Sequence, residues 1–310
     1  MKLTGTIIRS TGSWYEILSE DKLDIYKGRL RGKFKIKDLK VTNPLAVGDV
    51  VKFELEKSAD ETAIIYEILP RVNYFIRQSV QRAAYGHLIA TNLDQIIMIV
   101  TLKQPRTSMG FIDRFVVSAE AFRIPAILIF NKSDLNTEAE KEILLSVFTI
   151  YEKLGYHCLA TSALNDEGIE DFRKLLKGKR SLLSGHSGVG KSTLLNYIAP
   201  ELGLKTAEIS NFANKGVHTT TFAELFEIWP GTQIIDTPGI KELALFDIGP
   251  DVLSHYFPEM RDLLGLCKYN NCKHFNEPKC AVQEHVKSGN IAESRYHSYL
   301  SMLHNYDSHK

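Results

Sequence analysis

Apolar and polar residues alternate in short runs over the first 70 residues. The runs LTGTIIR, WYEIL, DVVKFEL and AIIYEIL are separated by turn residues such as Gly12, Pro44 and Gly48. A period of two places every second side chain on the same face of a strand. About five such strands predict a small Greek-key barrel of the OB type over residues 1–70.

The pattern changes after residue 93 to near-continuous apolar runs separated by a helical pattern. Residues 93–102 and 125–130 have the composition of strands covered on both faces, and residues 110–122 carry apolar side chains at helical intervals. Alternating strands and helices predict a doubly wound, mostly parallel sheet. We expect this α/β domain over residues 71–246, entered through a linker at residues 71–86.

The last part of the chain, residues 247–310, is expected to be a small helical domain with helices near 251–264 and 291–306. The 310 residues are 44% hydrophobic and 24% charged, which is an ordinary globular composition. No apolar run has the length of a signal-peptide core or a bilayer span, so we expect a cytoplasmic protein without membrane contact. Because the net charge is only +1, a nucleic-acid partner would be met by a local patch.

A glycine-rich loop between a predicted strand and a predicted helix is the clearest chemical motif. Residues 181–193, SLLSGHSGVGKST, match the P-loop pattern, in which backbone N–H groups bind phosphate oxygens. Lys191 would contact the β- and γ-phosphates as a catalytic cation, and Ser192 would hold Mg²⁺. The motif alone does not choose between ATP and GTP. Its predicted nucleotide-binding residues are Gly185, His186, Ser187, Gly188, Val189, Gly190, Lys191, Ser192 and Thr193.

An N-K-S-D sequence follows the second buried strand of the α/β domain. The Asp134 carboxylate can accept two parallel hydrogen bonds from guanine N1–H and the 2-amino group, a donor pair that adenine lacks. The Asn131 amide would serve the N7 edge, and the Lys132 stem would lie along the base. At the end of the next strand, a backbone N–H of a T-S-A sequence would bind O6, so the motifs together favour GTP. The predicted guanine-binding residues are Asn131, Lys132, Ser133, Asp134, Ser162 and Ala163.

Two further segments have the character of nucleotide switches. Thr220 and Thr221 of the H-T-T-T sequence would complete Mg²⁺ coordination with Ser192, and Asp236 of D-T-P-G would hold the ion through water. The Gly239 N–H would meet the γ-phosphate. For the threonines, an ordinary strand is the alternative, and which of them faces the metal stays open.

Hydrolysis requires a water molecule held in line with the γ-phosphate. Ras uses a Gln directly after D-x-x-G, but Ile240 occupies that place here and cannot orient water. His218 is therefore the candidate, either as a hydrogen-bonding positioner or as a base. The alternative for His218 is a surface histidine in a loop. We expect slow intrinsic turnover that rises when a partner orders this loop.

The order of the motifs differs from that of a Ras-like GTPase, which begins with the P-loop and ends with N-K-x-D and S-A. Here N-K-S-D and T-S-A precede the P-loop, the threonines and D-T-P-G. The same sheet can form if the usual ends are joined and the chain is reopened elsewhere, because termini of compact domains often lie close together. The order therefore predicts a circularly permuted GTPase domain.

Three cysteines and one histidine cluster within fourteen residues near the C-terminus, at Cys267, Cys272, His274 and Cys280. Three thiolates and one imidazole suit tetrahedral Zn²⁺ and leave no open position, which predicts a structural zinc site. Because the small domain cannot bury a large core, zinc would contribute directly to its folding.

Basic residues are concentrated between positions 22 and 40, and from residue 31 to 37 they fall at alternate positions. On a strand, this spacing would place them on one face, where they could track an RNA backbone. A solvated edge that lysines protect from aggregation is the alternative. The eight residues are Lys22, Lys27, Arg29, Arg31, Lys33, Lys35, Lys37 and Lys40.

An OB-like domain, a permuted GTPase domain with GHSGVGKST, HTTT, DTPG and NKSD, and a C-terminal cysteine cluster together resemble the bacterial ribosome small-subunit-dependent GTPases. The likeness covers essentially the whole chain, including FIDRFVVSAEAFRIPAILIFNKSDL and NEPKCAV. It implies a late assembly factor of the small ribosomal subunit that hydrolyses GTP to GDP and phosphate when stimulated by that subunit. It also implies contacts of the barrel and the zinc domain with ribosomal RNA. We further expect a monomer.

Two other functions remain open at this point. An RNA-binding scaffold that uses GTP only as a ligand is favoured by Ile240, which leaves the usual water-positioning place without a polar group. An ATP-dependent kinase or ATPase is opposed by N-K-S-D.

Overall fold

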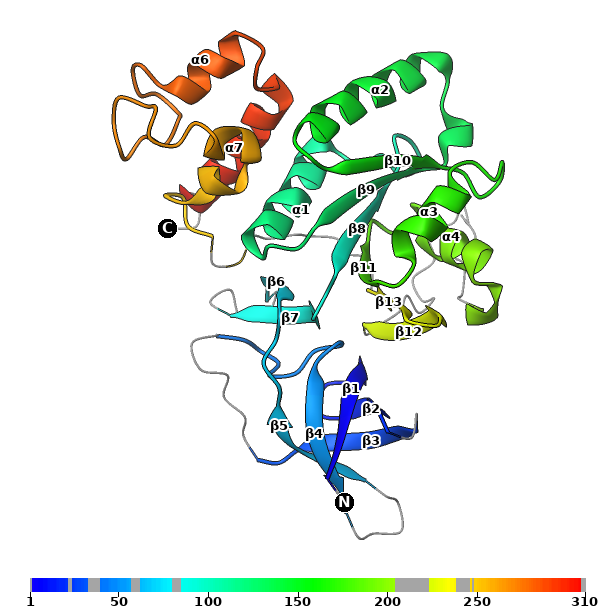
Figure 1. Ribbon diagram of the computed structural model, residues 1–310. Coiled ribbons are helices and arrows are strands. Elements are labelled where there is room, and N and C mark those ends of the chain that lie inside the picture. The colour runs from blue at the N-terminus through cyan, green and yellow to red at the C-terminus, as the bar shows by residue number, and fades with distance from the viewer. Residues whose placement is uncertain are drawn as a thin grey trace, which may run out of the picture.

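The computed structural model describes residues 2–21, 24–32, 40–56, 62–79, 85–203, 223–237, 246 and 248–307. A barrel lies at one end, an α/β layer structure forms the middle, and a small helical region lies beside helix α1 (Figure 1). The predicted fold class, a barrel followed by an α/β domain and a small helical region, is confirmed. Within the described ranges, no helix combines the length and the apolar composition that a bilayer span requires.

The N-terminal barrel closes because β1 pairs antiparallel with both β2 and β4. β3 runs parallel to β5, which pairs in turn with β4, and this order is that of an OB barrel. Ile17, Phe53 and Ile65 fill its interior. Of the basic strand expected over residues 31–37, only residues 31 and 32 are described, and they follow the end of β3 at Leu30. The strands are β1 Lys2–Ser10, β2 Tyr15–Ser19, β3 Ile25–Leu30, β4 Val50–Leu55 and β5 Ala63–Ile68.

The α/β domain contains a six-strand section in the order β10-β9-β8-β11-β13-β12, parallel except for β12. Helices α1 and α2 cover one face and α3 and α4 the other, each over its own apolar core. The strands are β8 Gln95–Val100, β9 Ala126–Asn131, β10 His157–Thr161, β11 Arg180–Ser184, β12 Glu224–Trp229 and β13 Thr232–Asp236. The helices are α1 Met109–Ala121, α2 Glu138–Lys153, α3 Ile169–Leu176 and α4 Lys191–Ile198, with short helices η1 Ser133–Leu135 and η2 Pro200–Leu202.

The segment expected to be a linker contains a strand, so that prediction was wrong. Strand β6 Tyr74–Gln78 pairs antiparallel with β7 Gly86–Thr91, between the barrel and the α/β domain (Figure 1). The reason is burial: Phe75 is completely buried and its ring packs near those of Phe115 and Phe122. The strand was not predicted because the arginines in the sequence of this segment suggested an exposed linker.

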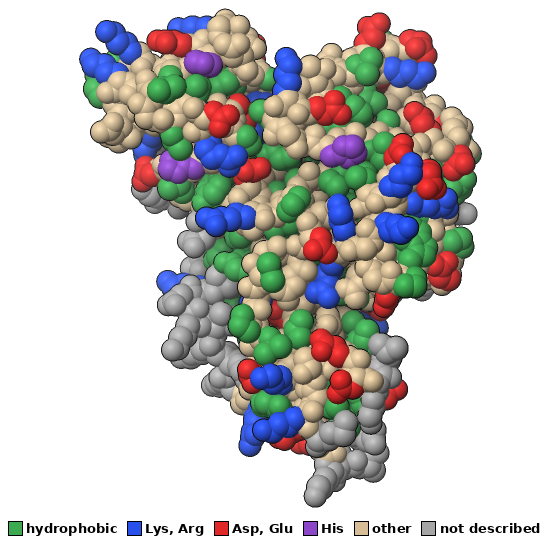
Figure 2. Space-filling model, viewed as in Figure 1, with side chains coloured by type: hydrophobic (Ala, Val, Ile, Leu, Met, Phe, Trp, Pro, Cys, Tyr) green, Lys and Arg blue, Asp and Glu red, His purple; other side chains and the backbone are tan. Residues whose placement is uncertain are grey.

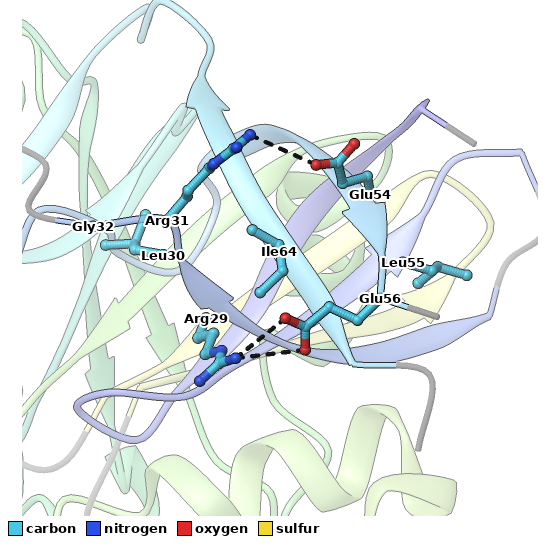
Figure 3. A pocket seen from close by; sticks show the side chains of 8 residues that line it. All are labelled: Arg29, Leu30, Arg31, Gly32, Glu54, Leu55, Glu56 and Ile64. Carbon is cyan, nitrogen blue, oxygen red and sulfur yellow. Dashed lines mark hydrogen bonds and ion pairs between the residues drawn. The ribbon is translucent and has the colours of Figure 1, made fainter. Parts of the chain in front are cut away.

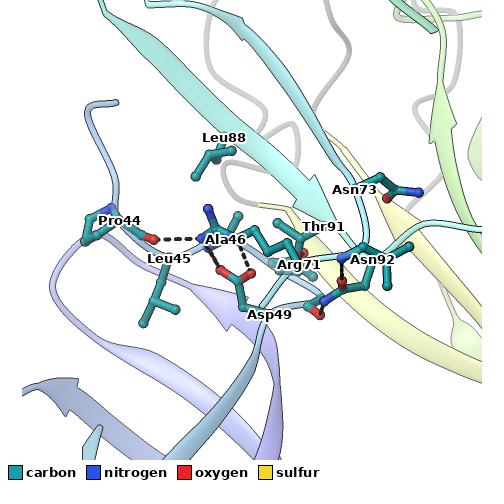
Figure 4. A network of polar contacts seen from close by, with 12 residues as sticks. Pro44, Leu45, Ala46, Asp49, Arg71, Asn73, Leu88, Thr91 and Asn92 are labelled. Atoms are coloured by element: carbon teal, nitrogen blue, oxygen red, sulfur yellow. Dashed lines mark hydrogen bonds and ion pairs between the residues drawn. The ribbon is translucent and has the colours of Figure 1, made fainter. Parts of the chain in front are cut away.

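The barrel is joined to the α/β domain by a polar network at the turn before β4 (Figure 4). Arg71 donates to both carboxylate oxygens of the buried Asp49, at 2.6 and 2.7 Å. The Gly48 carbonyl accepts from Asn92 at 2.9 Å and from Arg180 at 3.1 Å. A second link is the pairing of β1 with β12, which makes the barrel and the α/β sheet continuous.

The C-terminal region packs on α1 through a buried charged group. Arg295 is fully buried, and it contacts Asp113 of α1 at 2.6 Å and Glu259 at 2.7 Å. The helix expected over residues 251–264 is interrupted, because Pro258 lacks an amide hydrogen and begins a new helix at its first position. The elements are η3 Leu253–Tyr256, α5 Pro258–Arg261, α6 Ala281–Lys287 and α7 Glu293–Asp307.

Candidate nucleotide and metal sites

The predicted P-loop lies where the chain passes from β11 into α4, at the carboxyl edge of the parallel strands. This edge is where open α/β sheets bind ligands. Gly190 has φ +89°, and a Cβ there would lie 2.5 Å from Asn131 Nδ2. A side chain at residue 190 would therefore separate the phosphate loop from the N-K-S-D turn. The His186 ring lies 4.0 Å from that of Phe111 in α1, and burial lowers the pKa of His186.

The amino group of Lys191 contacts the strand next to the P-loop. It lies 2.7 Å from Asp236 Oδ1 and donates to the Thr237 carbonyl at 2.5 Å. Both side chains of the ion pair are largely buried, at 12% and 5% exposure. Strands β11 and β13 are adjacent, with Leu183 opposite Asp236. Lys191, which was predicted to bind phosphate, and Asp236, which was predicted to hold the metal, therefore lie in direct contact.

The N-K-S-D turn is bound to the P-loop through two side chains. Asn131 donates to the Val189 carbonyl at 2.9 Å, and Lys132 donates to the Gly188 carbonyl at 2.7 Å. Lys132 also donates to the Gln104 carbonyl at 2.8 Å, a contact that the sequence did not indicate. Burial lowers the pKa of Lys132, while the nearby Asp134 charge acts in the opposite direction.

The T-S-A turn after β10 meets the N-K-S-D turn from the other side. Thr161 donates to the Asn131 side-chain oxygen at 3.0 Å, and Ser162 donates to Asp134 Oδ1 at 2.5 Å. The hydroxyl of Ser162 therefore restrains one oxygen of the Asp134 carboxylate. The structure therefore brings together all the described residues that were predicted to bind nucleotide, on three adjoining loops, with Ala163 next in sequence after Ser162.

Several predicted residues lie outside the described part of the chain. They are the candidate catalytic residue His218, the threonines Thr220 and Thr221, the glycine Gly239 and Ile240. Of the predicted magnesium ligands, the structure places Ser192 in the first turn of α4 and Asp236 at the end of β13.

The cysteine and histidine cluster near the C-terminus has the dimensions of a metal site. The four ligand atoms of Cys267, Cys272, His274 and Cys280 lie within 4.8 Å of one another. His274 Nδ1 is 3.4 Å from Cys280 Sγ and 3.6 Å from Cys267 Sγ, and these two sulfurs are 3.9 Å apart. Tetrahedral zinc with its usual bond lengths separates ligand atoms by about 3.5–3.8 Å. The cluster therefore fits a metal ion of this kind.

Comparisons with known proteins agree with this arrangement. The model of the RsgA GTPase family matches residues 68–246, and that of the RsgA N-terminal domain matches residues 4–65. A Cytophaga hutchinsonii protein named small ribosomal subunit biogenesis GTPase RsgA is 55% identical over 308 residues, covering 99% of this chain and 100% of that protein. The chain belongs to the RsgA GTPase family.

As a member of the RsgA family, the chain is a GTPase. A Bacteroides fragilis relative with the same name is 48% identical over 301 residues, covering 97% of this chain and 96% of that protein. The crystal structure of YjeQ from Thermotoga maritima matches with a TM-score of 0.77 and 35% identity over 98% of both chains. YloQ, described as a circularly permuted GTPase, matches with a TM-score of 0.73 and 28% identity, over 100% of this chain and 96% of that chain. The predicted circular permutation is confirmed.

Proposed function

We propose that this GTPase acts in the biogenesis of the small ribosomal subunit, which it binds and which stimulates its hydrolysis of GTP to GDP and phosphate. The name of its relatives, small ribosomal subunit biogenesis GTPase RsgA, supports the small subunit as the partner. The observation that carries the nucleotide assignment is the contact between loops, in which Asn131 of N-K-S-D donates to Val189 of the P-loop. A guanine base and its phosphates would then be held by two loops that are already in contact.

The residue roles belong to the same proposal. Asp134 would read guanine N1–H and the 2-amino group, with Asn131, Lys132, Ser133, Ser162 and Ala163 around the base. Lys191 and the backbone of residues 185–193 would bind the phosphates, joined by Gly239. Ser192 and Asp236 would hold Mg²⁺ with Thr220 or Thr221, and His218 would position the water. Hydroxyl and carboxylate oxygens are the donors that Mg²⁺ prefers, which supports this ligand set.

We propose zinc as the metal of the Cys267, Cys272, His274 and Cys280 cluster, in a structural role. Metal binding would hold together the segment 267–280, which contains no regular helix or strand. Removal of zinc with a strong chelator should lower the melting temperature of the C-terminal region, and one equivalent of Zn²⁺ should restore it. A metal-free protein with unchanged melting behaviour would contradict the structural role.

The barrel and the zinc region are proposed as the surfaces that bind ribosomal RNA. Among the described residues on the face shown in Figure 2, Lys and Arg side chains are mixed with Asp and Glu. In a hollow of the barrel, Arg29 pairs with Glu56 at 3.2 Å and Arg31 with Glu54 at 3.7 Å (Figure 3). Such exposed pairs are weak, so RNA phosphates could take the place of the glutamates.

The proposed organisation is an RNA-binding domain over residues 1–70, a GTPase domain over 71–246 and a zinc domain over 247–310, in a cytoplasmic monomer. The test is GTP turnover by the purified protein alone, with small subunits, and with large subunits and ATP as controls. We expect stimulation that requires both GTP and the small subunit, and we expect His218→Ala to lose it. Tight GTP binding without stimulated phosphate release would favour an RNA-binding scaffold, and unchanged stimulated turnover in His218→Ala would remove the catalytic role of that histidine.

A further inference from the structure

We propose that Glu167 and Ser133 are positioning residues for guanine recognition. The hydrogen bond between their side chains holds the N-K-S-D turn against the T-S-A turn, so that Asp134 faces the base in one orientation. This inference rests on the proposed role of Asp134. It extends recognition to Glu167, which belongs to none of the sequence motifs considered above.

The contacts form a closed ring of four residues. Ser133 donates from Oγ to Glu167 Oε2 at 2.5 Å. Glu167 and Ser162 exchange two backbone hydrogen bonds of 3.0 Å each. Ser162 donates from Oγ to Asp134 Oδ1 at 2.5 Å, and the peptide bond between Ser133 and Asp134 closes the ring. Movement of Asp134 away from its present position would therefore strain contacts on both loops.

The backbone of both loops requires such a constraint. Lys132 and Asp166 have φ of +60° and +57°, in the left-handed region that side chains disfavour. Gly168 has φ +67°, and a Cβ there would lie 2.1 Å from the Ala160 carbonyl oxygen. The chain after Ser162 thus folds back sharply on β10, and this fold directs Glu167 towards Ser133.

The exposure of Glu167 indicates that its hydrogen bond with Ser133 acts on the orientation of the loops more than on the stability of the fold. Ser133 is buried at 8% exposure, whereas Glu167 is exposed and lines a hollow that also contains Lys141 and Asn165. A hydrogen bond to an exposed carboxylate contributes little to global stability, because water competes for it. Its main effect would be on the orientation of Asp134. That residue is held by the Ser162 hydroxyl and by its peptide bond to Ser133, and the hydrogen bond to Glu167 restrains the position of both.

A comparison of guanine with hypoxanthine nucleotides reports whether the Asp134 carboxylate is correctly oriented. Both bases carry N1–H, but only guanine has the 2-amino group that accounts for the second hydrogen bond to Asp134. When the carboxylate rotates, the paired geometry is lost and with it the advantage of guanine over hypoxanthine. Loss of the Ser133–Glu167 contact should therefore lower the affinity for guanine nucleotides and leave the affinity for inosine nucleotides almost unchanged.

The experiment measures GDP and IDP affinities for the full-length protein and for the variants Glu167→Ala, Glu167→Gln and Ser133→Ala, for the double variant of Glu167→Ala with Ser133→Ala, and for one control variant. The wild type should prefer GDP by about tenfold, the value of one such hydrogen bond. Glu167→Ala and Ser133→Ala should each remove most of this preference, and the double variant should be no worse than either single one. Glu167→Gln keeps an acceptor for Ser133 and should retain the preference. Glu170→Ala, an exposed carboxylate in the first turn of α3, is the matched control.

The outcomes separate the inference from the proposed function. Equal losses for GDP and IDP in Glu167→Ala and Ser133→Ala would indicate a merely structural role and overturn the inference, as would unchanged affinities. A wild-type protein without preference for GDP over IDP would overturn the guanine role of Asp134 as well. Ser133→Ala deletes a single oxygen, so it keeps the test valid if Glu167→Ala does not fold.

Discussion

The two halves of the nucleotide site differ in what their side chains contact. In the proposed base half, Asn131 and Asp134 already make hydrogen bonds to the neighbouring loops, the latter to Ser162. In the phosphate half, Lys191 is paired with Asp236, although the two have different proposed ligands, a phosphate and a magnesium ion.

The two halves would therefore respond differently to a ligand. The side chains of the proposed base half are already held by hydrogen bonds, so a bound guanine would spend little binding energy on ordering them. In the phosphate half, Lys191 contacts Asp236, so the proposed roles require Lys191 to exchange Asp236 for phosphate oxygens, which would make Asp236 available for Mg²⁺. The exchange would take place at the end of β13, whose last residue, Asp236, is the first residue of D-T-P-G, and this sequence leads on to the C-terminal region.

Removal of Lys191 should have the largest effect. Lys191→Ala deletes the cation that would stabilise charge on the transferred phosphoryl group, so subunit-stimulated turnover should fall by about a thousandfold. Phosphate release under saturating small subunits is the measurement. Lys174→Ala, an exposed lysine of α3, provides the control. Turnover within a fewfold of wild type would show that Lys191 is not part of the phosphate site.

A change at Asp134 should act on the base alone. Asp134→Asn replaces an acceptor by a donor, so GDP affinity should fall by about a hundredfold, while xanthosine diphosphate, whose 2-oxo group accepts, should gain. Competition binding with both nucleotides measures the exchange. Asp171→Asn on α3 controls for the loss of a surface charge. A variant that loses GDP and XDP equally would contradict preorganised base recognition.

The features that could be predicted from the sequence are those whose residues lie close together along the chain. The P-loop, N-K-S-D, the alternating strands of the barrel and the cysteine cluster each occupy one short segment, and each lies where its pattern indicated. Their roles in binding and catalysis stay predictions. The contacts that were missed join distant segments: Ser133 with Glu167, and Lys191 with Asp236. Such pairs depend on which strands and loops become neighbours, and local periodicity carries no information on that.

The exchange of partners at Lys191 is tested most directly by the affinity of Asp236→Asn for GDP without Mg²⁺. The substitution leaves a largely buried ammonium group without its charged partner, which raises the free energy of the unliganded protein, and bound phosphate would relieve this cost. The variant should melt at a lower temperature than wild type, yet bind GDP about tenfold more tightly. Equal or weaker GDP binding by a folded Asp236→Asn protein would contradict the proposed exchange.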